Sequence, residues 1–429
     1  MSVQAALVFL SFIFLSLAGM PVFLSMGFMG LVGLYLMHGS LALAIQDVAL
    51  ITWEATSGFT LLAIPLFIFS GTLMQRTGIS RDLFDFGNAL VGGMRNGLGV
   101  AVILASAVFS AISGSSSATA AALGVVTLPI LAEKGYPEGL RGGIACAGGT
   151  LGIMIPPSIT MILFGALTET SVGKLFMAGV FPGLLLTAVY SLYLFVFARP
   201  GIKGDSTEWA VKFEYFRKAL WALSMPAVVL GGIYSGLATP TEIGAISCVY
   251  AMVLGSIVYR TLGFKELKAA AYDAVGATTM IMMLVGCGLA MARFLTLSHV
   301  PQALATVVEV YHVGPLEFIT FLLAVYFVLG MVLEPASMML ITIPVFFPVT
   351  QLLHIDPLYF GVFIVITNEL AMLTPPVGLN LYIISGIGKI PIEKIIVACI
   401  PYLICIIIAL YICTLYTPLC LYLPQTMLK

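Results

Sequence analysis

The chain has 429 residues, of which 61% are hydrophobic and 9% are charged, and its net charge is −1. Its mean hydropathy is +1.12. A soluble domain carries roughly 25% charged residues, so the composition excludes a soluble globular protein and a disordered chain. The balance of charge gives no sign of a nucleic acid partner. Because the apolar runs are long and continuous rather than alternating, a transmembrane β-barrel is excluded as well. We predict an all-α polytopic membrane protein with room for about a dozen spans.

Apolar segments that predict membrane spans follow one another along the chain. They lie at 3–19, 22–38, 59–75, 98–131, 141–167, 176–198, 219–237, 243–259, 275–296, 316–350, 358–387 and 397–420. The first segment lacks a basic stretch before it and a small-residue cleavage site after it, which favours a first span over a signal peptide. Amphipathic stretches between the spans are too polar to cross a bilayer and predict helices near the interface. These stretches are 42–57, 80–94, 264–273 and 299–312.

The basic residues define an orientation. With the polar segment 199–218 inside and the N-terminus outside, all 18 Lys and Arg residues except Lys174, Arg293 and Lys429 lie on the inner side. Lys and Arg accumulate on the cytoplasmic side of membrane proteins, so we predict this orientation. Arg293, near an outer membrane end, is interpreted as an anchor whose stem lies along apolar surface while its charge reaches the interface.

Two apolar segments, 98–131 and 316–350, are long for one span and short for two. Each is interrupted in its middle by residues that favour turns or helix starts, at 113–117 and at 334–337. Irregular backbone at membrane depth is tolerated only where protein or an aqueous cavity surrounds it. We therefore predict two re-entrant helical hairpins, one entering from each side of the membrane.

The two halves of the chain match at an offset of 219 residues. The matching prolines are Pro129 with Pro348, Pro156-Pro157 with Pro375-Pro376, and Pro182 with Pro401. Each half has the same order of span, amphipathic helix, hairpin, proline-broken span and final span, which predicts inverted repeats typical of secondary transporters. The first repeat is 1–198, with its hairpin at 98–131 and broken span at 141–167. A cytoplasmic linker, 199–218, leads to the second repeat, 219–429, with its hairpin at 316–350 and broken span at 358–387.

The hairpin tips and the broken spans are predicted to converge near the membrane midplane. Proline breaks free backbone carbonyls, and helix termini attract ions of opposite sign. With hydroxyl groups nearby, this suits Na⁺ coupled to an anionic substrate. The candidate Na⁺ ligands, through side-chain or backbone atoms, are Ser115, Ser117, Gly149, Thr150, Pro156, Ala336, Ser337, Thr374, Gly378 and Asn380. The candidate substrate residues are Ser116, Thr119, Ser158, Asn368 and Glu369.

Some of these residues have structural alternatives. The serine cluster 115–117 could serve close helix packing. Glu334 could only cap the helix that Pro335 begins. Glu369 is a functional candidate because a carboxyl group at membrane depth is costly, but it could also form a structural hydrogen bond.

Signatures of enzymes and of resident cofactors are lacking in the sequence. It contains no Walker A motif, no H-E-x-x-H and no G-x-S-x-G. The four histidines are scattered, and the seven cysteines lie mostly in apolar runs without a C-x-x-C pair, so we expect no metal cofactor. An intramembrane enzyme using the serine cluster 115–117 would need a basic partner at membrane depth. This enzyme and a non-transporting assembly scaffold remain alternative interpretations.

Several motifs together resemble the large membrane subunit of tripartite ATP-independent periplasmic (TRAP) transporters, the DctM-like family. In the first half these are FSAISGSSSAT at 109–119, KGYP at 134–137 and LGIMIPPS at 151–158. In the second half they are IDP at 355–357, NE at 368–369 and TPPVGLN at 374–380. His354 and Ala371 stand where the family pattern has glycine.

The resemblance implies an elevator-type Na⁺/organic-acid symporter of the bacterial inner membrane, with a periplasmic N-terminus by the orientation above. It further implies a small four-helix membrane subunit, which we expect to be a separate chain, and a soluble periplasmic substrate-binding protein. Typical cargos of the family are sialic acid, C4-dicarboxylates and other carboxylates. The alternative within transport is a stand-alone elevator-type carboxylate carrier of the same superfamily.

Overall fold

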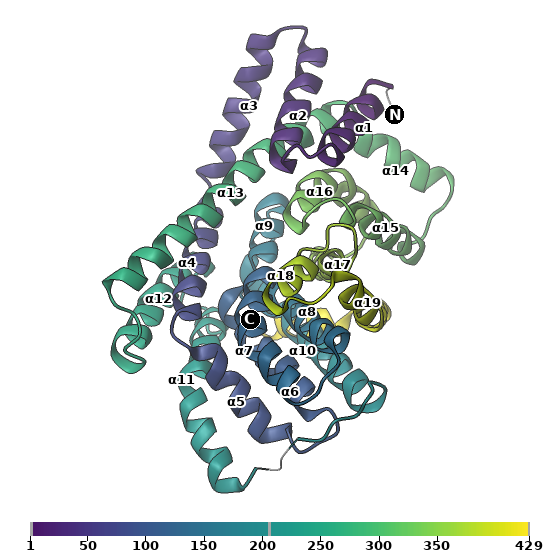
Figure 1. Ribbon diagram of the computed structural model, residues 1–429. Helices are drawn as coiled ribbons and strands as arrows, with labels where there is room; N and C mark the ends of the chain where they lie inside the picture. Colours follow the sequence, from purple (N-terminus) through teal and green to yellow (C-terminus); the bar gives the residue numbers. More distant parts are fainter. Residues whose placement is uncertain (1–2, 205–206, 428–429) are drawn as a thin grey trace.

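The computed structural model describes residues 3–204 and 207–427, which fold into a bundle of α-helices (Figure 1). Eight of the described helices are long and apolar enough to cross a membrane, or up to nine if one bent pair counts as a single span. The prediction of an all-α polytopic membrane protein is therefore confirmed.

The N-terminal helices lie at the periphery of the bundle (Figure 1). They are α1 (Val3–Leu17), α2 (Val22–His38), α3 (Leu41–Thr56), α4 (Ala63–Gln75) and α5 (Ile79–Val91). Helix α3 packs along α2 and α13. It meets the segment Phe59–Gln75, which contains α4, at an angle of 59°.

The corresponding helices after the middle of the chain are also peripheral. They are α11 (Trp209–Tyr234), α12 (Pro240–Val253), α13 (Phe264–Leu297) and α14 (Val300–Val310). Helix α11 begins at Trp209, within the segment predicted as the linker, so the non-helical connection is shorter than that segment.

Helix α13 corrects one sequence prediction. The amphipathic stretch 264–273 and the span 275–296, predicted as separate elements, form one helix of 34 residues. The change from polar to apolar side chains near Asp273 alters the surroundings of the helix but supplies no proline or other break. At about 1.5 Å per residue, such a helix is about 51 Å long, so its polar first turns extend beyond the roughly 30 Å hydrocarbon layer.

The remaining helices, which include the most deeply buried ones, form two groups. The first group is α6 (Gly97–Ser113), α7 (Ser116–Glu133), α8 (Glu138–Met154), α9 (Ile159–Thr168) and α10 (Val172–Val196). The second group is α15 (Pro315–Gly330), α16 (Pro335–Leu352), α17 (Pro357–Leu373), α18 (Leu379–Gly388), α19 (Ile392–Leu415) and α20 (Pro418–Met427). Helices end and restart inside both predicted hairpins and both predicted broken spans.

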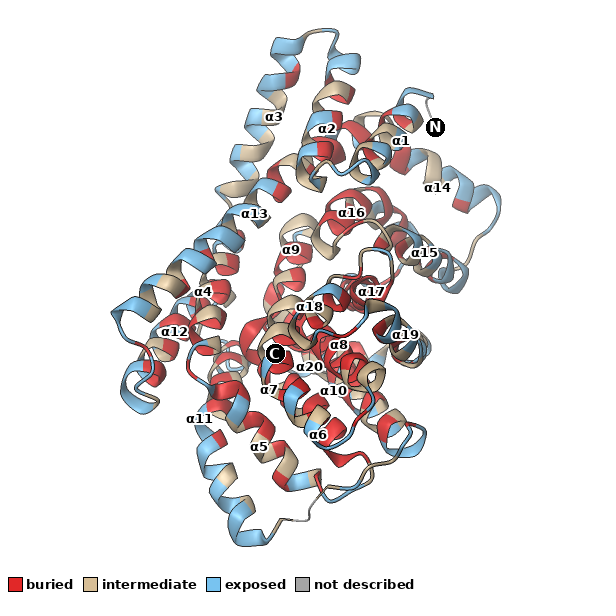
Figure 2. Ribbon diagram, viewed as in Figure 1, coloured by how far each residue is buried: buried red, intermediate tan, exposed pale blue. Residues whose placement is uncertain are grey.

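Burial separates the interior from the periphery. Helices α6, α8 and α17 are buried over nearly their whole length, whereas α3 has a single buried residue, Ala44 (Figure 2). In a bilayer the exposed apolar side chains of the peripheral helices face lipid, so they need no protein cover. The buried helices are those that contain or adjoin the chain breaks.

Candidate functional site

The tip of the first hairpin is a two-residue break between α6 and α7. Gly114 ends α6 in the left-handed region, at φ +63°. Ser115 then caps α7, because its hydroxyl accepts a hydrogen bond from the backbone N–H of Ala118 at 3.4 Å. Across the tip, the hydroxyls of Ser113 and Thr119 are 2.7 Å apart and buried. The predicted residues Ser115 and Thr119 thus lie together at this tip.

The first broken span ends α8 at Met154 and restarts as α9 at Ile159. Ser158 connects the two ends: its hydroxyl donates to the carbonyl of Ile153 at 2.5 Å and accepts from the backbone N–H of Met161 at 3.3 Å. The Pro156-Pro157 peptide bond is cis. The carbonyl of Ile153, which the proline break frees at the end of α8, is already satisfied by the Ser158 hydroxyl.

The first hairpin tip touches the first break directly. The backbone N–H of Ile159 donates to the carbonyl of Gly114 at 3.3 Å. A Cβ atom at Gly152 of α8 would lie 2.3 Å from the carbonyl oxygen of Ser115. Glycine at position 152 therefore allows the tip and the broken span to approach backbone to backbone.

The second half repeats this contact. The chain breaks at 331–334, between α15 and α16, and at 374–378, between α17 and α18. The backbone N–H of Val377 donates to the carbonyl of Met331 at 3.3 Å, which joins these two breaks. Gly378 begins α18 at φ +31°. In both halves a backbone hydrogen bond thus connects the hairpin break to the broken span.

The polar candidates of the second half differ in their contacts. Glu334 precedes α16 and makes no capping hydrogen bond to it; the Ser337 hydroxyl donates to its carboxylate at 3.4 Å. Ala336 lies beside Ser337 in the first turn of α16. Thr374 ends α17 and donates to the carbonyl of Leu370 at 2.6 Å. The Thr374 hydroxyl therefore already has one acceptor within its own helix.

Asn380 connects the two halves. Its side-chain N–H group donates to the Ser116 hydroxyl at 2.9 Å and to the carbonyl of Cys146 at 3.2 Å. Its side-chain oxygen is buried and has no hydrogen-bond partner within the described part of the chain. Gly149 opens space here, because a Cβ atom there would lie 3.0 Å from the Asn380 amide nitrogen. A buried junction of α7, α8 and α18 thus contains oxygens from three segments, one of them unsatisfied.

Asn368 and Glu369 lie in the middle of α17 and are fully buried. Among the described residues, neither side-chain polar atom of Asn368 and neither carboxyl oxygen of Glu369 has a hydrogen-bond partner. Buried polar groups normally have partners, and an unpaired buried group costs about 1–3 kcal/mol. These side chains therefore have unused capacity to bind a ligand or an ion.

At the repeat offset of 219, Asn368 and Glu369 correspond to Gly149 and Thr150 of α8. The Thr150 hydroxyl donates to the carbonyl of Ala147 at 2.8 Å and lies 3.1 Å from the hydroxyl of Tyr190. Tyr190 lies on α10. Sequence reasoning missed Tyr190, since nothing in its local sequence distinguishes it from other apolar-run tyrosines.

The candidate residues thus form two groups, which Asn380 connects. The first group lies where the first hairpin meets the first break and consists of Ser115, Ser116, Thr119 and Ser158, with Pro156 inside that break. Thr374 and Gly378 flank the second break, and Asn380 joins α18 to the first group. Ser117 is half-buried on α7.

The chain was compared with known proteins. The family described as "Tripartite ATP-independent periplasmic transporter, DctM component" matches residues 9–419. The C4-dicarboxylate TRAP transporter large permease protein DctM of Pseudomonas aeruginosa is 39% identical over 89% of this chain and 90% of its own length. The sialic acid TRAP transporter large permease protein SiaM of Vibrio cholerae is 32% identical over 96% of each chain. Both relatives are named as permeases, not as enzymes.

A solved structure supports the fold. The YdaH transporter of Alcanivorax borkumensis superposes with a TM-score of 0.60, at 14% identity, over 86% of this chain and 87% of its own. At that identity the similarity speaks for the arrangement of helices alone. The family match and the relatives carry the assignment, and with them the motif resemblance is confirmed. The chain belongs to the tripartite ATP-independent periplasmic transporter family, as a large permease of the DctM type.

Proposed function

We propose that the chain imports an organic acid together with Na⁺ across the bacterial inner membrane, with its N-terminus in the periplasm. A periplasmic binding protein delivers the acid, and a small four-helix membrane subunit completes the transporter. The substrate is an acid of the sialic acid or C4-dicarboxylate class. This choice rests on the two relatives described above, one named for C4-dicarboxylates and the other for sialic acid.

The observation that carries Na⁺ coupling is the junction around Asn380. Its side-chain oxygen is buried without a hydrogen-bond partner among the described residues, while its side-chain nitrogen donates to the Ser116 hydroxyl and the Cys146 carbonyl. Unwound backbone and helix ends in secondary transporters coordinate Na⁺ through such neutral oxygens. A bound Na⁺ would satisfy the Asn380 oxygen and tie the first hairpin to the second broken span. The other Na⁺ candidates named from the sequence are proposed as ligands nearby.

Helix starts support an anionic substrate. Helices α7, α9, α16 and α18 all begin at the chain breaks. The first turn of a helix presents free N–H groups and a partial positive charge, so helix starts of this kind attract carboxylates. The buried amide of Asn368 adds a donor without a partner. We place the organic acid between these helix starts.

The elevator mechanism is proposed from how the breaks are connected. Within each half a backbone hydrogen bond ties the hairpin to the broken span, and Asn380 ties the halves together. Hairpins and broken spans therefore form one body that can move as a unit. The peripheral helices α1–α5 and α11–α14 form the scaffold along which this body slides. The inverted repeats predicted from the sequence give the two end states of such a movement.

The test is uptake into proteoliposomes that contain the chain and both partner proteins. Uptake should collapse when Na⁺ is replaced by K⁺. Asn380→Ala should raise the Na⁺ concentration for half-maximal uptake roughly 5- to 150-fold, the equivalent of about 1–3 kcal/mol for an unsatisfied buried group. Thr127→Ala is the matched control, since Thr127 is a buried residue of α7 bonded only within its own helix, to Leu123.

Other outcomes would contradict parts of the proposal. Uptake that persists in K⁺ but stops with a protonophore would replace Na⁺ by H⁺, with Glu369 as the candidate carrier. Uptake by the chain without the binding protein would favour the stand-alone carrier. If Asn380→Ala needs the same Na⁺ concentration for half-maximal uptake as the wild type, the junction around Asn380 does not bind Na⁺.

A further inference from the structure

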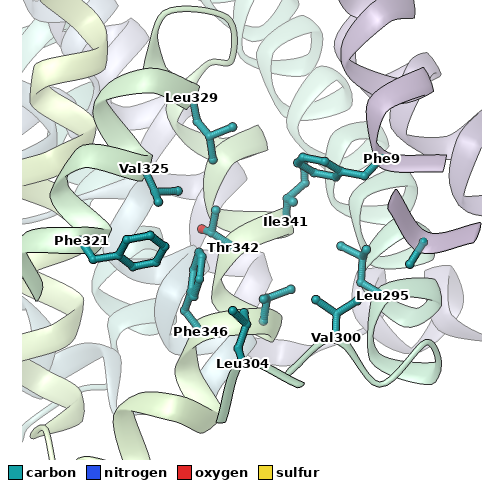
Figure 3. A pocket seen from close by; sticks show the side chains of 12 residues that line it. Phe9, Leu295, Val300, Leu304, Phe321, Val325, Leu329, Ile341, Thr342 and Phe346 are labelled. Atoms are coloured by element: carbon teal, nitrogen blue, oxygen red, sulfur yellow. The ribbon is translucent and has the colours of Figure 1, made fainter. Parts of the chain in front are cut away.

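A cavity of about 240 Å³ lies between the peripheral helices and the second hairpin. On one side are α1, α13 and α14, which contribute Phe9, Leu295 and Leu304; on the other are α15 and α16, which contribute Phe321 and Phe346 (Figure 3). The side chains from the two sides point toward one another across the space (Figure 3). Leu329, next to the end of α15, lines the cavity, which therefore reaches toward the break at 331–334. The described residues that line it do not include those of the junction around Asn380.

The lining of this cavity is apolar. Among the described residues that line it, Thr342 is the one polar side chain. Its hydroxyl donates to the carbonyl of Met338 at 2.7 Å and also contacts the hydroxyl of Tyr326. Water in a protein cavity needs two to four polar partners, and an apolar cavity of about 150 Å³ stays dry and binds apolar molecules. The contents of this space are therefore expected to be hydrocarbon, not water.

The cavity is continuous with the membrane-facing surface. Phe321 lines it and is 50% exposed, and Val328, on the same helix, is 61% exposed. Opposite, Leu10 and Phe14 of α1 are also exposed. The exposed apolar surfaces of α1 and α15 face lipid in a bilayer, so a lipid chain can reach the cavity sideways from the bilayer.

We propose that this cavity is a binding site for one acyl chain of a membrane phospholipid. The chain fills the contact between the peripheral helices and the second hairpin, where two protein surfaces meet without close packing. Tight packing of side chains would lock the two surfaces together, because protein interiors are packed as densely as organic crystals. A flexible hydrocarbon chain fills the same space and still lets the surfaces slide. This last consequence rests on the proposed elevator movement, whereas lipid binding itself does not.

The test uses the full chain in nanodiscs made from phosphatidylglycerol that carries a photoreactive diazirine in one acyl chain. After illumination, adducts should be enriched on peptides from α15 and α16 relative to peptides from the lipid-facing helix α12. Leu304→Trp places a large side chain inside the cavity and should reduce those adducts roughly tenfold, the change that about 1.4 kcal/mol produces. Val249→Trp is the matched control, because Val249 lies on α12, is 57% exposed and does not line the cavity.

Val345→Phe is the second variant if the tryptophan prevents folding, since it replaces a small side chain of the cavity lining by a phenyl ring. Equal adducts in wild type and in the filled variants would overturn the proposal. Adducts on α15 and α16 no greater than those on α12 would also overturn it. Because the readout is labelling rather than uptake, it does not depend on the substrate or on Na⁺ coupling.

Discussion

Replacing Gly152 with alanine should weaken the contact between the first hairpin tip and the first broken span. The added Cβ would lie 2.3 Å from the carbonyl oxygen of Ser115 and 2.8 Å from the backbone nitrogen of Ser116, well inside the ordinary contact distance of 3.4 Å. Both neighbours are backbone atoms, which cannot rotate away. Overpacking typically costs about 1–3 kcal/mol, and here we expect the upper end of that range. The better helix propensity of alanine offsets about 1 kcal/mol of this, so the free energy of unfolding should fall by about 2 kcal/mol.

The assay is thermal unfolding of the purified chain together with Na⁺-driven uptake in proteoliposomes. Gly152→Ala should lower the unfolding midpoint and reduce uptake, because the hairpin tip is displaced from the break. Gly386→Ala is the matched control: Gly386 lies in α18, and a Cβ there would meet no atom within 4 Å. If Gly152→Ala unfolds and transports like this control, the close approach of tip and break is refuted.

Three further predictions concern single contacts and use the same unfolding assay. Tyr190→Phe should lower the free energy of unfolding by about 1 kcal/mol. It should leave the Na⁺ concentration for half-maximal uptake unchanged, because Thr150 keeps its hydrogen bond to Ala147; a higher Na⁺ concentration would contradict this. Asn96→Ala should lower the free energy of unfolding by roughly 2–4 kcal/mol. Buried Asn96 has a left-handed backbone, at φ +51°, and its side chain bonds to the carbonyls of Leu194 and Ala198 and to the N–H of Ile202. Asn96→Gly separates the backbone cause from the side-chain cause, since glycine tolerates this backbone but lacks the hydrogen bonds. Asp273→Ala should change stability by less than about 1 kcal/mol, because both partners of its ion pair with Arg76 are at least one-third exposed; a large loss would mean that the pair is shielded.

The helix breaks could be predicted from the sequence because their causes are local. Gly114 takes a left-handed conformation and Ser115 caps the next helix, and both properties belong to the residue type. The double prolines at 156–157 and 375–376 each remove two successive backbone N–H donors, which favours the end of a helix. Composition alone excluded a soluble globular protein, since only 9% of the residues are charged.

The failures have a different physical origin. The division of α13 was wrong because hydropathy records the surroundings of a helix and not its continuity. The contact between Asn380 and Ser116 joins residues 264 positions apart, and its geometry depends on how α7, α8 and α18 pack. Tyr190 was missed for the same reason: only packing brings its hydroxyl to Thr150. Local rules place the breaks, whereas the partners at the breaks depend on tertiary structure.

The two broken spans are unequal at equivalent positions, and this asymmetry bears on the proposed chemistry. In α8 these positions hold Gly149 and Thr150, which are satisfied by close packing and by Ala147 and Tyr190. In α17 they hold Asn368 and Glu369, whose side-chain polar atoms have no hydrogen-bond partner among the described residues. An amide can donate to a carboxylate, but an ionised carboxylate only accepts and repels another anion. Under the proposed function, Asn368 therefore suits the organic acid, while the partner that Glu369 lacks must be a cation or a proton. Under the proposed function, α17 thus offers a donor to the organic acid and a carboxyl group to a proton or cation, in addition to the Na⁺ site proposed at Asn380 of α18.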